Sequence, residues 1–246
     1  MPSPKPGPCT ILAIDPGETT GIAVLSLNPR WLRGVGAPTW EGLGSAVISR
    51  YAVQVGRDPK TFDTGIGKTA KSTNELLEAH HLPVMGSQPL EDEPDFDARF
   101  FAILRDEWAA SGGDLTMLDA NEIRQLRQIQ GLLEIYPKAA LVVESFQLRQ
   151  MSQDPVLLSP ERMRFAITSN EVLHGSVGRL PVLQSSSYAM TTATDERLNR
   201  ARLYMPGMKH ATDAMRHATT FARDCRKDEA TRARAFPRHF KVKESS

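Results

Sequence analysis

Cysteine is scarce in this chain of 246 residues, which contains only Cys9 and Cys225. Two isolated cysteines do not provide the spaced ligands of a zinc site, and they do not make a disulfide scaffold. This usage fits a reducing compartment, so we expect a cytoplasmic protein.

Long apolar runs are missing as well. No stretch approaches the ~20 apolar residues that a membrane-spanning helix needs, so we expect no membrane partner. Four prolines stand within residues 1–9, unlike the apolar core of a signal peptide, and we expect a flexible leader there. The length favours a single domain over residues 10–235, followed by a basic tail at 236–246.

Net charge is small but unevenly distributed. The chain carries a net charge of +1, yet residues 197–246 hold 13 Lys and Arg against 5 Asp and Glu. The rest of the chain holds 17 against 24 and is therefore acidic. A basic C-terminal fifth is typical of proteins that bind a phosphate backbone, and equally of a solvated helix face with a tail.

The segment Ile11–Leu25 is the most informative part of the chain. An apolar run leads directly into Asp15, a Pro-Gly turn follows, and small hydroxylated residues precede a second apolar run. The pattern predicts a β-hairpin of two buried strands with one carboxylate at the end of the first. Because a buried charge is costly unless something binds it, Asp15 indicates a metal ion or a catalytic task.

Two later segments repeat this logic. Residues 139–145 predict a short buried strand that ends at Glu144, which would place a second acid at the same sheet edge as Asp15. A long helix is predicted after Pro206-Gly207, and His210 and Asp213 share one of its faces because they are three residues apart. His217 lies one turn further on the same side, where packing or surface polarity is the favoured interpretation.

The remaining pattern alternates strands and helices, which indicates an α/β fold. An apolar stripe predicts a helix over 121–136, and residues 180–184 predict a strand. Residues 46–55 fit either a short helix or a strand, and the Gly- and Pro-rich residues 27–45 predict strand edge and loop. Further helices are expected at 160–173, at 69–81 and after Asp95, the last two within an insertion at about 56–118.

Three motifs stand in order along the chain: Asp15-Pro16-Gly17 with Thr19-Thr20-Gly21, Val142-Val143-Glu144-Ser145-Phe146, and the helix segment from His210 to Ala218. Together they resemble one enzyme family, the RuvC-type Holliday-junction resolvases, and especially the RuvC-like nucleases of tailed bacteriophages. The resemblance covers residues 10–27 and 121–226, and their order and spacing are more specific than any single motif.

The resemblance implies an RNase H-like fold with a central five-stranded mixed sheet flanked by helices. It implies that Asp15, Glu144 and Asp213 hold two Mg²⁺ or Mn²⁺ ions, with His210 at a position that is an acid or a histidine in the family. Two cations about 4 Å apart activate a water and stabilise the leaving 3′-oxygen, which gives 5′-phosphate and 3′-hydroxyl ends. The implied function is structure-selective cleavage of branched DNA, in the bacterial host cytoplasm if the chain is phage-encoded.

The resemblance also suggests substrate contacts. Phe146 would stack against a base, and Arg149, Lys209 and Arg216 would contact phosphates, although a core position for Phe146 and ordinary surface charges remain alternatives. The predicted helix at 160–173 matches the dimer helix of the family. A homodimer with two sites fits the two-fold symmetry of a four-way junction.

Two other functions stay open. A sugar-kinase or actin-like ATPase opens with a similar hairpin, but it needs a second glycine-rich phosphate loop that we do not find. Residues 64–69 resemble the end of a P-loop, yet Phe62 stands where that motif needs glycine, so we expect no nucleotide cofactor. The third possibility is a non-catalytic protein that binds branched DNA, against which the three acids argue.

Overall fold

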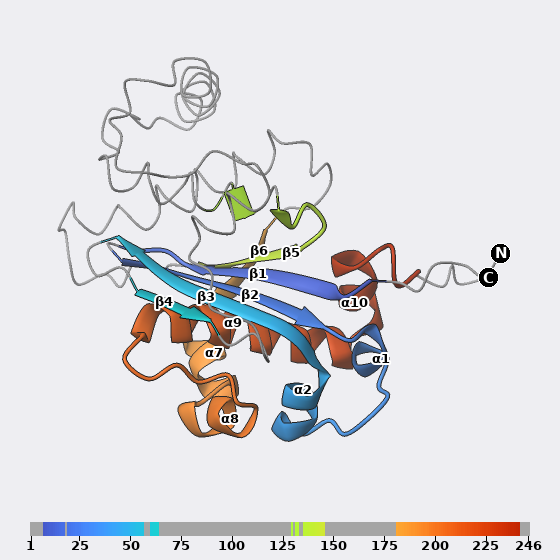
Figure 1. The fold of residues 1–246 in the computed structure, drawn as a ribbon. Helices are drawn as coiled ribbons and strands as arrows, with labels where there is room; N and C mark the ends of the chain where they lie inside the picture. Colours follow the sequence, from blue (N-terminus) through green and yellow to red (C-terminus); the bar gives the residue numbers. More distant parts are fainter. Residues whose placement is uncertain are drawn as a thin grey trace, which may run out of the picture.

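The computed structural model describes residues 7–17, 19–56, 60–63, 129, 131–132, 135–145 and 181–241. They form one α/β unit in which helices pack on a sheet (Figure 1). The predicted helices at 69–81, after Asp95 and at 160–173 lie outside the described residues. In the part of the chain that the structure describes, no helix is long and apolar enough to cross a membrane.

A mixed sheet of six strands forms the centre of the described chain, in the order β4-β3-β2-β1-β5-β6. The strands are β1 (Cys9–Asp15), β2 (Thr19–Leu27), β3 (Val47–Gly56), β4 (Lys60–Asp63), β5 (Ala140–Ser145) and β6 (Val182–Ser185). Strands β1 to β4 pair antiparallel in sequence order, whereas β5 is parallel to both β1 and β6. The predicted α/β class is confirmed, and β4 is a strand beyond the five that were expected.

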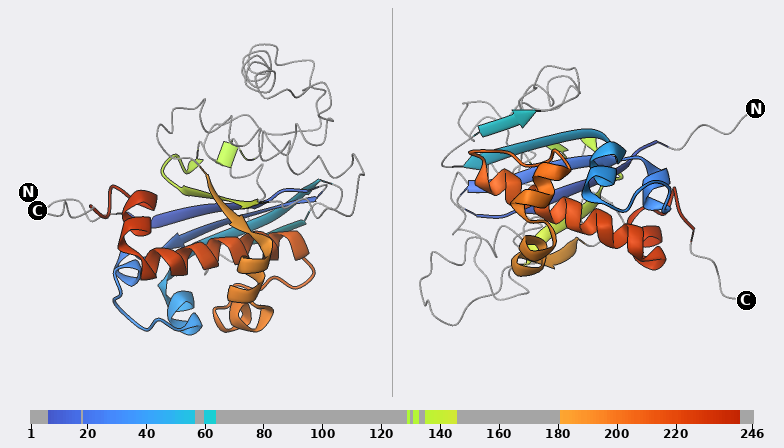
Figure 2. Two further views of the ribbon diagram at one scale, coloured as in Figure 1. Left: turned by 180° about the vertical axis from the view of Figure 1, so that it is seen from behind. Right: turned by 90° about the horizontal axis from the view of Figure 1, so that it is seen from below.

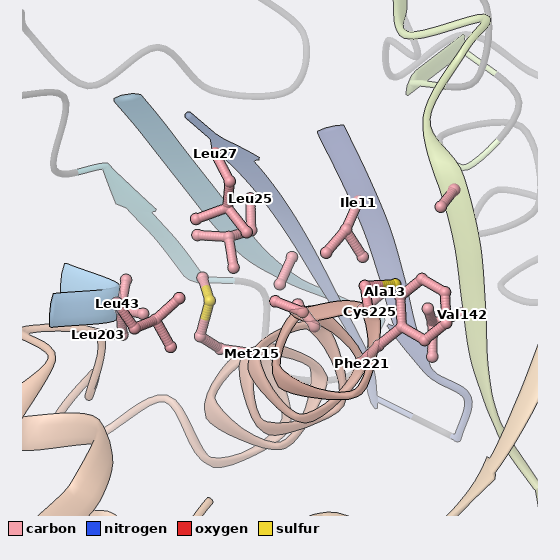
Figure 3. Packing of buried hydrophobic residues seen from close by; sticks show 14 of the residues in the cluster. Ile11, Ala13, Leu25, Leu27, Leu43, Val142, Leu203, Met215, Phe221 and Cys225 are labelled. Carbon is pink, nitrogen blue, oxygen red and sulfur yellow. The ribbon is translucent and has the colours of Figure 1, made fainter. Parts of the chain in front are cut away.

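One face of the sheet is covered by helices (Figures 1 and 2). The long helix α9 (Lys209–Lys227) lies along β1 and β2, as predicted. Figure 3 shows Ile11, Ala13 and Leu25 of the sheet packed toward Met215 and Phe221 of this helix. The other helices are α1 (Pro29–Leu32), α2 (Trp40–Ala46), α7 (Ser186–Thr192), α8 (Asp195–Arg200) and α10 (Glu229–Ala235).

The opposite face of the sheet has its own apolar cluster. Leu12 and Ile14, which alternate with the residues facing α9, pack there with Ile129 and Leu132. These two belong to helical residues inside the predicted helix at 121–136. Because both faces are covered, β1 and β2 are buried almost throughout, which explains their continuous apolar sequence.

Five short helices were not predicted, and a side-chain cap accounts for each, including the cap that Asp228 provides for α10. Residues 27–45, expected as strand edge and loop, contain α1 and α2, whose first turns are capped by Asn28 and Thr39. Ser185 and Thr194 cap α7 and α8 in the same way. Helices this short present little apolar periodicity, so their turn-rich sequences conceal them.

The expected ends of the domain shift slightly. Strand β1 already begins at Cys9, inside the range assigned to the leader, and Cys9 is fully buried. Phe236 and Phe240, assigned to the basic tail, are buried members of the same apolar cluster as Ile11 and Met215. The folded unit therefore extends at least to Phe240.

Candidate functional site

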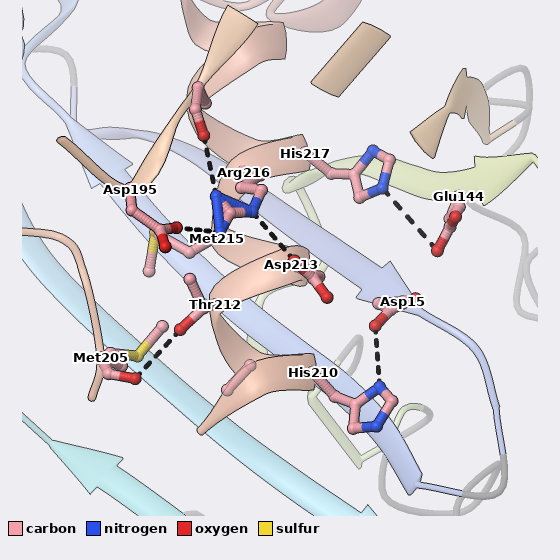
Figure 4. A network of polar contacts seen from close by, with 12 residues as sticks. Asp15, Glu144, Asp195, Met205, His210, Thr212, Asp213, Met215, Arg216 and His217 are labelled. Carbon is pink, nitrogen blue, oxygen red and sulfur yellow. Dashed lines mark hydrogen bonds and ion pairs between the residues drawn. The ribbon is translucent and has the colours of Figure 1, made fainter. Parts of the chain in front are cut away.

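Three carboxylates from distant parts of the sequence meet at one end of the sheet. Asp15 ends β1, and Glu144 lies near the end of the parallel neighbour β5, where Ile14 pairs with Val143 one step earlier. Asp213 projects from the first turns of α9 toward both (Figure 4). The predicted juxtaposition of two strand-end acids and the helix acid is present in the structure.

The Asp15 and Glu144 carboxyls are close enough to share a proton. Asp15 is 7% exposed, and burial raises the pKa of its carboxyl to about 6. Burial also raises the pKa of Glu144, and the hydrogen bond and negative charge of Asp15 raise it further. At neutral pH Glu144 therefore keeps its proton, and its O–H group donates a hydrogen bond to the Asp15 carboxylate.

His210 lies on the other side of Asp15. Its Nδ1 is 3.2 Å from Asp15 Oδ2, and burial lowers the pKa of the imidazole. A neutral ring with its proton on Nδ1 donates a hydrogen bond to the carboxylate. His210 thus belongs to the cluster, as the sequence predicted.

Two sheet residues fix the first turn of α9 beside Asp15. The Gln54 side chain of β3 accepts hydrogen bonds from the backbone N–H groups of His210, at 2.9 Å, and Ala211, at 3.4 Å. Met208, at the N-cap position, makes no side-chain cap bond, so Gln54 performs this task from the sheet. Gly21 of β2 lies so close that a Cβ there would be 1.9 Å from the His210 carbonyl oxygen.

Asp213 is held by Arg216, one turn further along α9. Arg216 Nε donates to Asp213 Oδ1 at 2.9 Å, and its terminal nitrogens bond to the Ala193 carbonyl oxygen, at 3.0 Å, and to Asp195. Arg216 is buried, so this guanidinium does not face solvent as a phosphate contact requires. Burial raises the pKa of the Asp213 carboxyl, whereas the charges of Arg216 and Lys209 oppose that rise.

His217 is part of the site, which the packing interpretation of this residue did not foresee. Its Nδ1 lies 2.9 Å from Gln184 Oε1 on β6, and its Nε2 lies 3.9 Å from Glu144 Oε2. The ring is almost fully buried, and burial lowers its pKa to about 4, so it is neutral at pH 7. The signal in the sequence was its spacing of four residues from Asp213.

Among the residues expected to contact DNA, Lys209 is exposed at the start of α9. Its charge lowers the pKa of both Asp15 and Asp213, so its ammonium group lies within electrostatic reach of the cluster. Phe146 and Arg149 lie outside the described residues.

The donor types suit a hard divalent cation, because carboxylate oxygens are the ligands that Mg²⁺ and Mn²⁺ prefer. In the present rotamers, no group of three His, Cys, Asp or Glu side chains among the described residues is arranged to hold one ion. Asp15 bonds with Glu144 and His210 instead, while Asp213 bonds with Arg216. Binding a cation would therefore require these side chains to exchange partners.

Comparison with protein-family models, with curated proteins and with solved structures gave no match. The function must therefore be argued from the residues and the geometry of this site.

Proposed function

We propose that this protein is a metal-dependent, structure-selective endonuclease that cleaves branched DNA, with Holliday junctions as the leading substrate and forks and flaps as others. The observation that carries the proposal is the meeting of Asp15, Glu144 and Asp213, from two parallel strands and one helix, at one buried sheet end. Three motifs that resemble RuvC-type resolvases supply these three acids, in the same order along the chain.

The electrostatics of the cluster support a cation. Burial raises the pKa of all three carboxyls, which means that their negative charges are poorly compensated. A divalent cation would offset that cost, with Asp15, Glu144 and Asp213 as ligands and His210 beside them. Bound Mg²⁺ or Mn²⁺ ions, two in the proposed site, supply an activated water and stabilise the leaving oxygen of a phosphodiester.

The surrounding side chains have distinct tasks in this proposal. Glu144 must give up its proton before it can act as a ligand, and the neutral His217 ring packs beside it, with Nε2 at 3.9 Å from Glu144 Oε2. His210 orients the Asp15 carboxylate through its Nδ1–H group. The exposed Lys209 is placed to contact a phosphate as the strand enters.

The fold is also compatible with the proposal, although it is less specific evidence than the acidic cluster. A mixed sheet with helices against it is what an RNase H-like nuclease requires, and the site lies where β1 and β5 end. A four-way junction has two-fold symmetry, so we propose a homodimer that presents two such sites to opposite strands.

The test compares the wild type with Asp15→Asn on labelled four-way junction, fork, flap and linear duplex, each with Mg²⁺ and with EDTA. We expect wild-type cleavage of branched substrates only with Mg²⁺, and loss of that cleavage in Asp15→Asn. Undiminished cutting by Asp15→Asn would refute the assignment of the site.

Other outcomes would favour the competing functions. Equal cleavage rates for linear duplex and junction would exclude a resolvase. ATP hydrolysis without DNA would indicate an actin-like or sugar-kinase-like ATPase. Tight junction binding without cleavage in Mn²⁺ would indicate a non-catalytic binding protein.

A further inference from the structure

Arg216 is a buried charge beside the acidic cluster that is anchored by several hydrogen bonds. Only 11% of its side chain is exposed, and its guanidinium contacts three partners at once. Asp213 Oδ1 accepts from Nε at 2.9 Å, the Ala193 carbonyl accepts from Nη1 at 3.0 Å, and Asp195 accepts from Nη2. A planar fork held at three points has little freedom to rotate.

We propose that Arg216 is a positioning residue that presents Asp213 to the cation, rather than a DNA contact. This inference rests on the proposed function, because it concerns how the same carboxylates bind metal. Arg216 holds Asp213 Oδ1, so the other oxygen is directed to the side on which Asp15 lies (Figure 4). Asp213 therefore offers a cation one oxygen in a fixed direction.

The anchor of Arg216 connects Asp213 to the segment that also supports Glu144. Ala193 and Asp195 lie at the junction of α7 and α8, and α7 follows β6 directly. Ser186, the first residue of α7, hydrogen-bonds to the Glu144 carboxyl group. The stretch from β6 to α8 thus fixes two carboxylates of the cluster from one side.

The charge of Arg216 and its positioning of Asp213 predict opposite changes in cation affinity when Arg216 is replaced. The guanidinium repels a cation electrostatically, so its removal strengthens cation binding if charge is what matters. If positioning matters, removal frees Asp213 to rotate and weakens cation binding. Arg216→Lys retains the charge but cannot form the three-point fork, so it isolates the positioning effect.

The experiment measures Mn²⁺ binding by electron paramagnetic resonance without DNA, and kcat and KM on four-way junction, for wild type, Arg216→Lys and Arg216→Gln. We expect both variants to bind Mn²⁺ about tenfold or more weakly and to lose kcat, with KM for the junction unchanged within about twofold. Arg226→Gln is the matched control. Arg226 also lies on α9 and also donates hydrogen bonds to backbone carbonyl groups, those of Gly34 and Gly36, but it is at the opposite end of the helix from the acidic cluster.

Arg226→Gln is expected to lower the melting temperature while leaving Mn²⁺ binding unchanged. Unchanged or tighter Mn²⁺ binding in Arg216→Lys would overturn the proposal, and a raised KM with normal Mn²⁺ binding would assign Arg216 to DNA instead. The proposed function fails separately, if Asp15→Asn leaves both Mn²⁺ binding and cleavage intact.

Discussion

At the residue scale, the unusual property of Asp15 is that its carboxylate is buried between two other titratable side chains. Glu144 donates to it from one side and His210 from the other. Burial thus disfavours the ionised form of Asp15, and carboxyl groups with pKa values perturbed in this way are common in functional sites. Two consequences can be measured without DNA.

Asp15→Asn should stabilise the metal-free protein at alkaline pH. The folded pKa of Asp15 is raised from 3.8 to about 6, so its stabilising contribution is complete below about pH 4 and is lost as pH rises through about 6. At pH 8 the ionised group costs on the order of 3 kcal/mol, which asparagine avoids. In EDTA at pH 8, we expect the variant to melt roughly 5–10 °C higher than wild type.

The same melting curves contain their own control. Near pH 4 the wild-type carboxyl is largely protonated, so the difference between the two proteins should shrink. Added Mg²⁺ should raise the melting temperature of the wild type more than that of the variant. A pH-independent difference would show that the carboxylate of Asp15 is not strained by burial.

His210→Asp should change the metal preference of the proposed cleavage activity. The substitution places a fourth carboxylate next to Asp15, where a hard ligand favours Mg²⁺ more than an imidazole does. We expect higher activity in Mg²⁺ relative to Mn²⁺, measured by titrating each metal against junction cleavage. Identical titrations for the two proteins would remove His210 from the metal site.

The sequence identified the acids of the site but not the residues that hold them. Asp15 and Glu144 could be identified because each directly follows a run of strand-forming apolar residues. Gln54 and Arg216 were not identifiable as site-supporting residues, because their partners lie on elements whose relative placement only the folded chain defines. Such long-range polar contacts have no local periodicity in the sequence.

At the element scale, the placement of α9 determines whether the cluster exists. Its first turn approaches β2 at Gly21 and is capped by Gln54 from β3. Small residues along the helix face, Ala211, Ala214, Ala218 and Ala222, are fully buried and permit close contact with the sheet. The opening hairpin therefore contributes a docking surface as well as a carboxylate.

Gly21→Ala should displace α9 and damage the site. The added Cβ would be 1.9 Å from the His210 carbonyl oxygen, which is backbone and cannot rotate away. We expect a loss of about 2 kcal/mol or more in the free energy of unfolding and a strong loss of cleavage, measured by denaturant melts and junction assays.

Gly17→Ala in the same hairpin is the matched control. A Cβ at Gly17 would lie 3.4 Å from the Thr19 carbonyl oxygen, which is an ordinary contact. This variant should fold with nearly wild-type stability. If Gly21→Ala behaved the same way, the close approach of α9 to β2 would not be needed.

Elements with strong apolar periodicity were predicted correctly, and those defined by caps were not. The hairpin, β5 and α9 follow from apolar runs or stripes, and their bounds differ from the prediction by a few residues. The ambiguous residues 46–55 form β3 because they pair along β2 over nearly their whole length. Tertiary pairing of this kind decides between helix and strand where local sequence does not.

At the scale of the whole molecule, much of the basic C-terminal charge serves the fold. Arg223 and Arg226 stack over Trp40 and Trp31, each with 4.6 Å between guanidinium and ring centre, and they bond to carbonyls of the segment that carries α1 and α2. Arg232 contacts the Leu32 carbonyl. The charge excess alone therefore does not identify a DNA-binding surface.

Substitutions should distinguish basic side chains that stabilise the fold from basic side chains that bind DNA. Arg226→Gln removes a stacked, carbonyl-bonded guanidinium and should reduce the free energy of unfolding by about 2 kcal/mol, with junction affinity unchanged. Lys209→Gln should leave stability unchanged, weaken junction binding and reduce the salt slope of that binding by about 1. Denaturant melts and salt-dependent binding curves measure both. The opposite pattern would contradict this division.

The most direct test of the account is single-turnover cleavage of a labelled four-way junction in Mg²⁺ by the wild type, Asp15→Asn, Glu144→Gln and Asp213→Asn. Arg226→Gln serves as a folded control with an intact cluster. We predict that each carboxylate variant loses cleavage by about a thousandfold or more while still binding the junction. Wild-type cleavage rates in any one of the three would contradict the claim that they form one metal-dependent site.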